Sequence, residues 1–311
     1  MSSARVVAVG GATRDVFLSG GGLAASLAGT ARHRAYHLPL GEKVEVAHEV
    51  LDVGGGAANA AVSFARQGLE AVFLGKVGDD RPGRDVIDLL DAEGVNVGDV
   101  ALDPRAATNL STVLLSDVGE RTILVFRGAT KRLKRADIPE AAIHGDWLYI
   151  TSLAGNIGML EWLVSLAHER GLSVALDPGK SELAYASRIL ALLPKVELLK
   201  ANREELAMLS GTNNLARSAA TLAKLGPTVV GTDGSRGAVA VSAEGSVAVP
   251  GPSTADAVDR TGAGDAFGAG LVGALARGQS LEAALRFANR NATACVKRVG
   301  ATAGLLRVRR A

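Results

Sequence analysis

Short runs of β-branched and other apolar residues alternate with longer amphipathic segments along most of the chain. The short runs predict strands, because branched side chains favour a pleated backbone, over residues 6–9, 71–74, 147–151, 173–176, 196–199 and 228–230. The amphipathic segments predict helices over residues 57–67, 84–93, 159–170, 181–192, 203–209 and 216–225. Several of these helices stop at a glycine, the residue that most readily closes a helix.

This alternation of strands and helices predicts an α/β fold with a mostly parallel central sheet and helices on both faces. The chain has 311 residues and no linker rich in proline and serine, so we expect a single domain over residues 1–311. Ligands of such sheets bind beyond the carboxyl ends of the strands, and candidate site residues are therefore sought there.

Two segments interrupt the alternation. Residues 13–53 read as short strands and turns with no convincing helix, and residues 110–127 hold two strand-like runs around the turn Asp117–Glu120. We expect the two segments to pair as a small β-sheet lid over the main sheet and to close on a ligand. Open edges of a lid invite pairing with a second chain, so we also expect a homodimer formed through the lid.

Composition narrows the range of functions. Apolar residues make up 48% of the chain, and the formal net charge of +2 argues against nucleic acid as a partner. Cys295 is the only cysteine and lies in an apolar run, which favours a buried thiol and allows no disulfide within the chain. We expect no membrane association and a cytoplasmic location, because long apolar stretches and a signal-peptide pattern are both missing.

The strongest chemical signal lies in the segment 259–267, where glycines precede a run of small apolar residues that predicts a helix. Backbone N–H groups at a helix N-terminus bind phosphate oxygens, and glycine lets the backbone come close to them. Asp265 falls in the first turn of this helix. There the helix dipole and the N–H groups are expected to keep it ionised, and by itself it is either a helix-stabilising or a catalytic aspartate.

The full string Asp259-Arg260-Thr261-Gly262-Ala263-Gly264-Asp265 resembles the C-terminal signature of the ribokinase/PfkB family of carbohydrate and nucleoside kinases. Further stretches resemble family motifs in the family's order, namely 54–61, 74–80 with Gly83, 202–205 and 232–237. The resemblance implies a ribokinase-like three-layer α/β/α domain with a small β-sheet lid. It also implies a carbohydrate kinase that uses ATP and Mg²⁺ to phosphorylate a hydroxyl of a small sugar or polyol.

The resemblance assigns a role to each matching residue. Asp265 is the expected catalytic base, and the anion hole is expected from the backbone N–H groups of Gly262, Ala263 and Gly264. Substrate hydroxyls are expected at Asp15, Gly55 and Asn59. Asn202 and Glu205 are expected to organise the ATP phosphates and Mg²⁺, largely through water, and other nucleotide contacts are expected at Thr232, Gly234, Gly237 and Asn289. Some members hold a monovalent cation such as K⁺ at the place of Asp259 and Thr261, with backbone near Gly300 and Gly304.

Two alternatives remain open at this point. A sugar or nucleotide sensor keeps such a fold without catalysis, but it is free to lose the carboxylate at position 265, which this chain retains. The other alternative is a nucleoside kinase, whose pocket usually stacks the base on aromatic side chains. The chain has only six Phe, three Tyr and two Trp, which favours a sugar or polyol.

Overall fold

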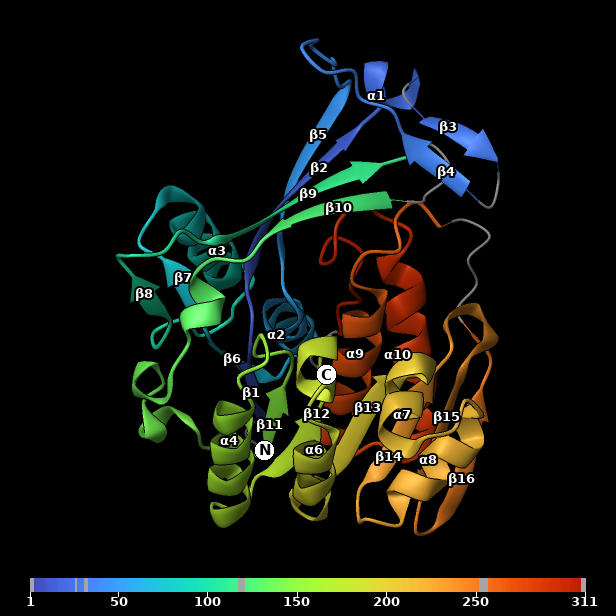
Figure 1. Ribbon diagram of the computed structural model, residues 1–311. Coiled ribbons are helices and arrows are strands. Elements are labelled where there is room, and N and C mark those ends of the chain that lie inside the picture. The colour runs from blue at the N-terminus through green and yellow to red at the C-terminus, as the bar shows by residue number, and fades with distance from the viewer. Residues whose placement is uncertain (1–2, 26, 31–32, 117–120, 252–256, 309–311) are drawn as a thin grey trace.

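The computed structural model describes residues 3–25, 27–30, 33–116, 121–251 and 257–308. Within these residues, eight strands form the central sheet in the order β16-β15-β14-β13-β12-β11-β1-β6 (Figure 1). Neighbours from β14 to β6 in this order run parallel, and β15 and β16 extend the sheet as an antiparallel hairpin. The strand bounds are β1 (Arg5–Val9), β6 (Glu70–Leu74), β11 (Trp147–Ile150), β12 (Ser173–Leu176), β13 (Leu198–Asn202), β14 (Thr228–Thr232), β15 (Ala238–Ser242) and β16 (Gly245–Val249).

Helices cover both faces of this sheet, so its strands are buried on both sides. In β1, Val6 and Ala8 belong to the core on one face, and Val7 and Val9 belong to the core on the other. The first face is covered by α2 (Gly56–Arg66), α3 (Arg81–Ala92), α9 (Ala263–Ala276) and α10 (Leu281–Cys295). The second is covered by α4 (Ile157–Glu169), α5 (Lys180–Leu183), α6 (Ala186–Leu192), α7 (Arg203–Ser210) and α8 (Leu215–Ala223).

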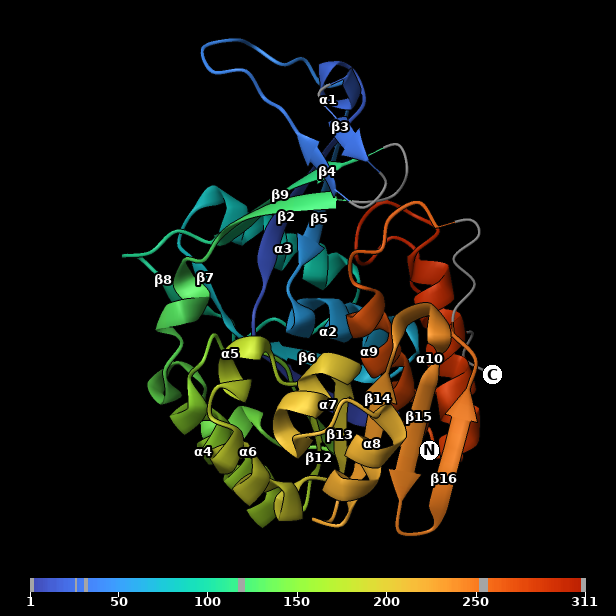
Figure 2. The same ribbon diagram turned by 45° about the vertical axis from the view of Figure 1, so that its right-hand side comes forward.

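A second sheet stands beyond the carboxyl ends of the central strands (Figures 1 and 2). Its strands lie in the order β10-β9-β2-β5, with the bounds β2 (Thr13–Ser19), β5 (His48–Gly54), β9 (Asn109–Leu115) and β10 (Arg121–Phe126). The chain runs from β1 directly into β2 of the small sheet, and from β5 directly into α2. Both connections therefore lie at the same edge of the central sheet. Smaller elements complete the fold: the one-turn helix α1 (Gly22–Ala25), the hairpin of β3 (Leu27–Thr30) and β4 (His33–Tyr36), and the pair β7 (Lys76–Gly78) and β8 (Ala101–Asp103).

The predicted α/β architecture and the separate small sheet are confirmed. Segments 13–53 and 110–127 supply the strands of that sheet, while the turn Asp117–Glu120 lies outside the described residues. That the sheet closes as a lid, and that residues 1–311 form one domain, stay predictions. Within the described residues, no helix is both long enough and apolar enough to cross a bilayer.

Several details of the sequence prediction were wrong. The helix expected over 181–192 is broken at Ala184 and Tyr185, where the backbone of Tyr185 leaves the helical region between α5 and α6. The buried carboxylate of Glu182, in α5, accepts from the N–H groups of Leu153 and Gly155. The strand expected at 196–199 begins at Leu198. The hairpin of β15 and β16 and the helix α10 were not anticipated, and the described part of 13–53 contains the helical turn α1.

Candidate active site

The start of α9 has the geometry of an anion-binding helix terminus. Gly262 precedes the helix with φ +74°, in the left-handed region, and a Cβ there would lie 2.5 Å from the Cβ of Ala301. Only glycine fits this turn without strain. The helix begins at Ala263, so its first N–H groups have no acceptor within the helix and remain available to a ligand.

A cavity of about 390 Å³ opens in front of this helix start. It lies at the carboxyl ends of β11 to β14 and reaches the small sheet, as expected for a ligand site in an open α/β sheet. Its lining includes the predicted residues Gly55, Asn202, Glu205, Thr232, Gly264 and Asp265. Lining residues that the sequence analysis did not single out include Thr13, Asn109, Arg127, Thr151, Asp177 and Lys200.

Asp265 is fixed by a residue from another helix. The side-chain Nδ2 of Asn59, on α2, donates a hydrogen bond of 2.8 Å to Asp265 Oδ2. Burial, followed by the negative charge of Asp177, raises the pKa of Asp265, while Asn59 and Lys200 oppose this rise. Burial and Asp177 thus act against the ionised form of this carboxylate. That Asp265 is ionised at neutral pH stays a prediction.

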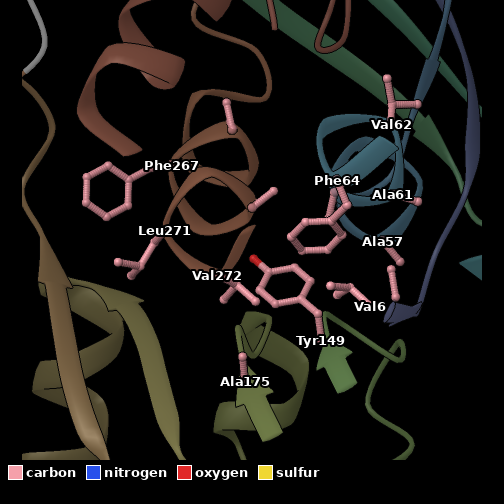
Figure 3. Packing of buried hydrophobic residues seen from close by; sticks show 14 of the residues in the cluster. Val6, Ala57, Ala61, Val62, Phe64, Tyr149, Ala175, Phe267, Leu271 and Val272 are labelled. Carbon is pink, nitrogen blue, oxygen red and sulfur yellow. The ribbon is translucent and has the colours of Figure 1, made fainter. Parts of the chain in front are cut away.

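A buried ionic network lies beside Asp265. Lys200 Nζ lies 3.0 and 2.8 Å from the two carboxylate oxygens of Asp177, and the Tyr149 hydroxyl donates to Asp177 Oδ2 at 2.9 Å. The Tyr149 ring meets Phe64 edge to face, with 5.6 Å between ring centroids, inside the core shown in Figure 3. The sequence held one signal for this network, a lysine inside the apolar run Leu198–Ala201.

The predicted nucleotide residues gather around a second cavity next to the start of α9. Thr232, Gly234, Gly237 and Asn289 line a smaller cavity of about 90 Å³, together with Ala263 and Gly264 at the helix start. The Oδ1 atom of Asn289 is buried and has no hydrogen-bond partner among the described residues. A buried amide oxygen without a partner is costly, so a ligand donor fits this position.

Asn202 and Glu205 form a reciprocal cap at the start of α7. Asn202 Oδ1 accepts from the Glu205 N–H at 3.0 Å, and Glu205 Oε2 accepts from the Asn202 N–H at 2.8 Å. This cap leaves the second carboxylate oxygen of Glu205, a residue of the cavity wall, without a hydrogen-bond partner among the described residues. Burial raises the pKa of Glu205. A positive charge nearby would lower this pKa again. One available carboxylate oxygen fits Mg²⁺ held through water.

Asp15 and Asn59 are not among the residues that line the cavity. Both side chains are buried, and Asp15 Oδ1 and Asn59 Oδ1 each lack a hydrogen-bond partner among the described residues. The carboxylate of Asp15 rests on Gly54, where any Cβ would come within 2.0 Å of Oδ2. Burial raises the pKa of Asp15 to about 7.

Asp259 and Thr261 lie apart from the cavity, in a buried turn next to Gly300. Asp259 Oδ1 accepts from the Thr261 N–H at 2.9 Å and its hydroxyl at 2.7 Å, and Oδ2 accepts from the Gly300 N–H at 3.1 Å. Both carboxylate oxygens thus have protein donors. Within the described part of the chain, no group of three acidic, histidine or cysteine side chains is placed to hold a metal ion. K⁺ binding stays a prediction.

Comparison with known proteins decides the family. Residues 26–307 match the profile described as "pfkB family carbohydrate kinase". The chain belongs to this family. As a pfkB-family carbohydrate kinase, it is a phosphotransferase of an ATP-using family.

Relatives of this pfkB kinase carry several substrate names. It is 35% identical over 239 residues to a fructokinase of Klebsiella pneumoniae, covering 72% of this chain and 76% of that protein. It is 32% identical over 257 residues to an aminoimidazole riboside kinase of Salmonella typhimurium, covering 78% and 80%. Its fold is similar to that of Arabidopsis thaliana ribokinase complexed with ribose and ATP, with a TM-score of 0.80, 24% identity and coverage of 99% and 96%. The comparisons thus establish the family, whereas the individual substrate has to be argued from the residues of the site.

Proposed function

We propose that this kinase transfers the γ-phosphoryl group of ATP to a hydroxyl of a small sugar or polyol, with Asp265 as the base. The observation that carries the proposal is the position of Asp265, in the first turn of α9 and in the wall of the cavity at the carboxyl ends of the sheet. A hydroxyl held there has a proton acceptor on one side and the helix N-terminus on the other.

The buried oxygens near Asp265 support a polyhydroxylated substrate. Asp15 Oδ1, Asn59 Oδ1 and Thr151 Oγ1 all lack hydrogen-bond partners among the described residues. Sugar hydroxyls donate to such oxygens, and satisfying each buried acceptor offsets a cost of about 1–3 kcal/mol. Side chains at the substrate end of the cavity are polar, namely Thr13, Asn109, Arg127 and Thr130, with no aromatic platform for a base.

The proposed transfer requires the phosphates to be held in line with the hydroxyl. We assign the anion hole to the backbone N–H groups of Gly262, Ala263 and Gly264, and the adenine end to the cavity lined by Gly237 and Asn289. Mg²⁺ would screen the phosphate charges, and Glu205 is the residue that would hold it through water. Asp265 then accepts the hydroxyl proton as the new phosphate ester forms.

A substrate panel tests the proposal. The protein is incubated with ATP and Mg²⁺ against sugars, polyols and nucleosides, and ADP formation is measured relative to ATP alone. We expect turnover with at least one sugar or polyol. Turnover with nucleosides only would keep the kinase and overturn the sugar assignment, while ligand binding without any ADP would indicate a sensor.

A further inference from the structure

Lys200 is a buried cation at the point where the phosphoryl group would pass. It lies in β13 with Leu198, Leu199 and Ala201, all buried, and its side chain is 8% exposed. Lys200 nevertheless lines the cavity of about 390 Å³ in front of α9. A Cβ placed on Gly264 would lie 3.5 Å from Lys200 Nζ, so the ammonium group sits against the first turn of α9.

The ion pair with Asp177 does not explain why a lysine occupies this strand. Burying two charges costs several kcal/mol, and apolar residues of similar volume are often as stable as a buried pair. An ammonium group carries three N–H donors. The two carboxylate oxygens of Asp177 accept from Lys200 Nζ at 3.0 and 2.8 Å. The described residues offer Lys200 no further acceptor. One donor therefore remains for a ligand.

The network around Lys200 holds it in one position. Asp177 is itself oriented by the Tyr149 hydroxyl, which points toward α9 in Figure 3. Tyr149 is fully buried and braced by Phe64. The side chain of Lys200 is thus supported before any ligand arrives, which is the condition under which a donor stabilises a transition state.

We infer that Lys200 is a catalytic residue of this kinase, which donates to an oxygen of the transferring phosphoryl group. The inference rests on the proposed function. In the step, the bond from Pγ to the bridging oxygen of ATP breaks and the bond from Pγ to the substrate oxygen forms. The hydroxyl proton passes to Asp265, and Lys200 keeps its protons throughout. A fixed positive charge there offsets the negative charge of Asp177 and Asp265 beside an anionic group.

Charge-paired substitutions separate this role from a structural one. Lys200→Met alone leaves Asp177 as a buried unpaired charge and is prone to fail in folding. The double variant Lys200→Met/Asp177→Asn removes both charges and keeps an acceptor for Tyr149. Asp177→Asn alone keeps the ammonium group. Lys195→Met is the matched control, because Lys195 is an exposed lysine bonded to Ser165.

The measurement is kcat and substrate KM of each variant with the best substrate from the panel, alongside melting temperature and ADP affinity. We expect the folded double variant to lose about 10²-fold in kcat, the usual effect of removing one transition-state donor, with substrate KM nearly unchanged. Asp177→Asn should lose less, and Lys195→Met should match the wild type.

Two results would overturn the inference while leaving the kinase assignment intact. A double variant with near wild-type kcat would show that Lys200 only neutralises Asp177. An Asp177→Asn variant as slow as the double variant would assign the effect to Asp177. A wild-type protein that phosphorylates no compound of the panel would instead overturn the proposed function, and the inference with it.

Discussion

The side-chain amide of Asn59 donates a 2.8 Å hydrogen bond to Asp265 Oδ2, across a separation of 206 residues. The bond joins α2, which follows the small sheet, to α9, which carries the predicted base. Asn59 Oδ1 remains without a partner among the described residues, so the same amide has an acceptor available to a substrate hydroxyl. One residue thus positions the proposed base and, in the proposed mechanism, would also accept from the hydroxyl that the base deprotonates.

Asn59→Ala is expected to shift the acidic limb of the kcat–pH profile to higher pH. The hydrogen bond from Asn59 lowers the pKa of Asp265, so its loss raises that pKa and a higher pH is needed to ionise the base. Substrate KM should also rise, because Oδ1 is lost. The profile is measured by steady-state ADP formation, and an unmoved acidic limb would show that Asn59 does not control Asp265.

Asp15 should make sugar binding depend on pH near neutrality. Burial raises its pKa from 3.8 to about 7, and a substrate hydroxyl prefers the ionised carboxylate as acceptor, so KM should fall as pH rises through about 7. Asp15→Asn should flatten this dependence. If KM of the wild type and of the variant follow the same pH curve, Asp15 does not contact the substrate.

Ionisation of Asp15 should lower the stability of the folded state, whereas ionisation of a salt-bridged aspartate raises it. The folded-state pKa of Asp15 is raised, so the folded state binds more protons and loses stability as pH rises from about 4 through about 7. In the absence of substrate, Asp15→Asn should therefore melt at a higher temperature than the wild type at about pH 8 and converge with it at about pH 4. Melting curves by circular dichroism measure this difference.

Two glycines at opposite ends of α9 form a matched pair. Gly262 has φ +74° and Gly278 has φ +76°, but a Cβ at Gly278 meets nothing within 4 Å, whereas one at Gly262 strikes Ala301. Gly278→Ala should cost only the left-handed backbone strain, about 1–2 kcal/mol. Gly262→Ala should cost more in denaturant unfolding and should also weaken ADP binding. Equal losses in the two variants would argue against a constrained anion hole.

The small sheet should mediate the predicted homodimer. Its edge strand β10 exposes Leu124, Val125 and Phe126 at 56%, 52% and 53%, an apolar edge that a second chain can cover. Light scattering should give the mass of a dimer for the wild type and of a monomer for Leu124→Lys. A wild-type monomer at high concentration would contradict this prediction.

Local sequence signals were sufficient for the framework of the site. The glycines before α9 specify a helix start, and the position of Asp265 in its first turn follows from helix geometry alone. The strand ends that line the cavity follow from the alternation of strands and helices, because parallel strands bring their carboxyl ends to one edge.

Contacts between distant segments were beyond sequence reasoning. The pairing of Lys200 with Asp177 depends on β13 lying next to β12, which no local pattern specifies. The raised pKa of Asp265 also depends on contacts between distant segments, because the residues packed around it remove it from water. The hydrogen bonds of Glu182 to the loop after β11 are a further contact of this kind.

The most direct test of the account is the turnover of Asp265→Asn. This substitution keeps size and polarity but removes the base, and general-base catalysis contributes about 10²–10⁴-fold. The variant is compared with the wild type in single-turnover experiments, where chemistry limits the rate, and ADP affinity is measured by calorimetry. The account predicts a loss of at least about 10²-fold in rate with ADP affinity near the wild-type value. A variant that reacts at a near wild-type rate would contradict the assignment of Asp265 and the mechanism built upon it.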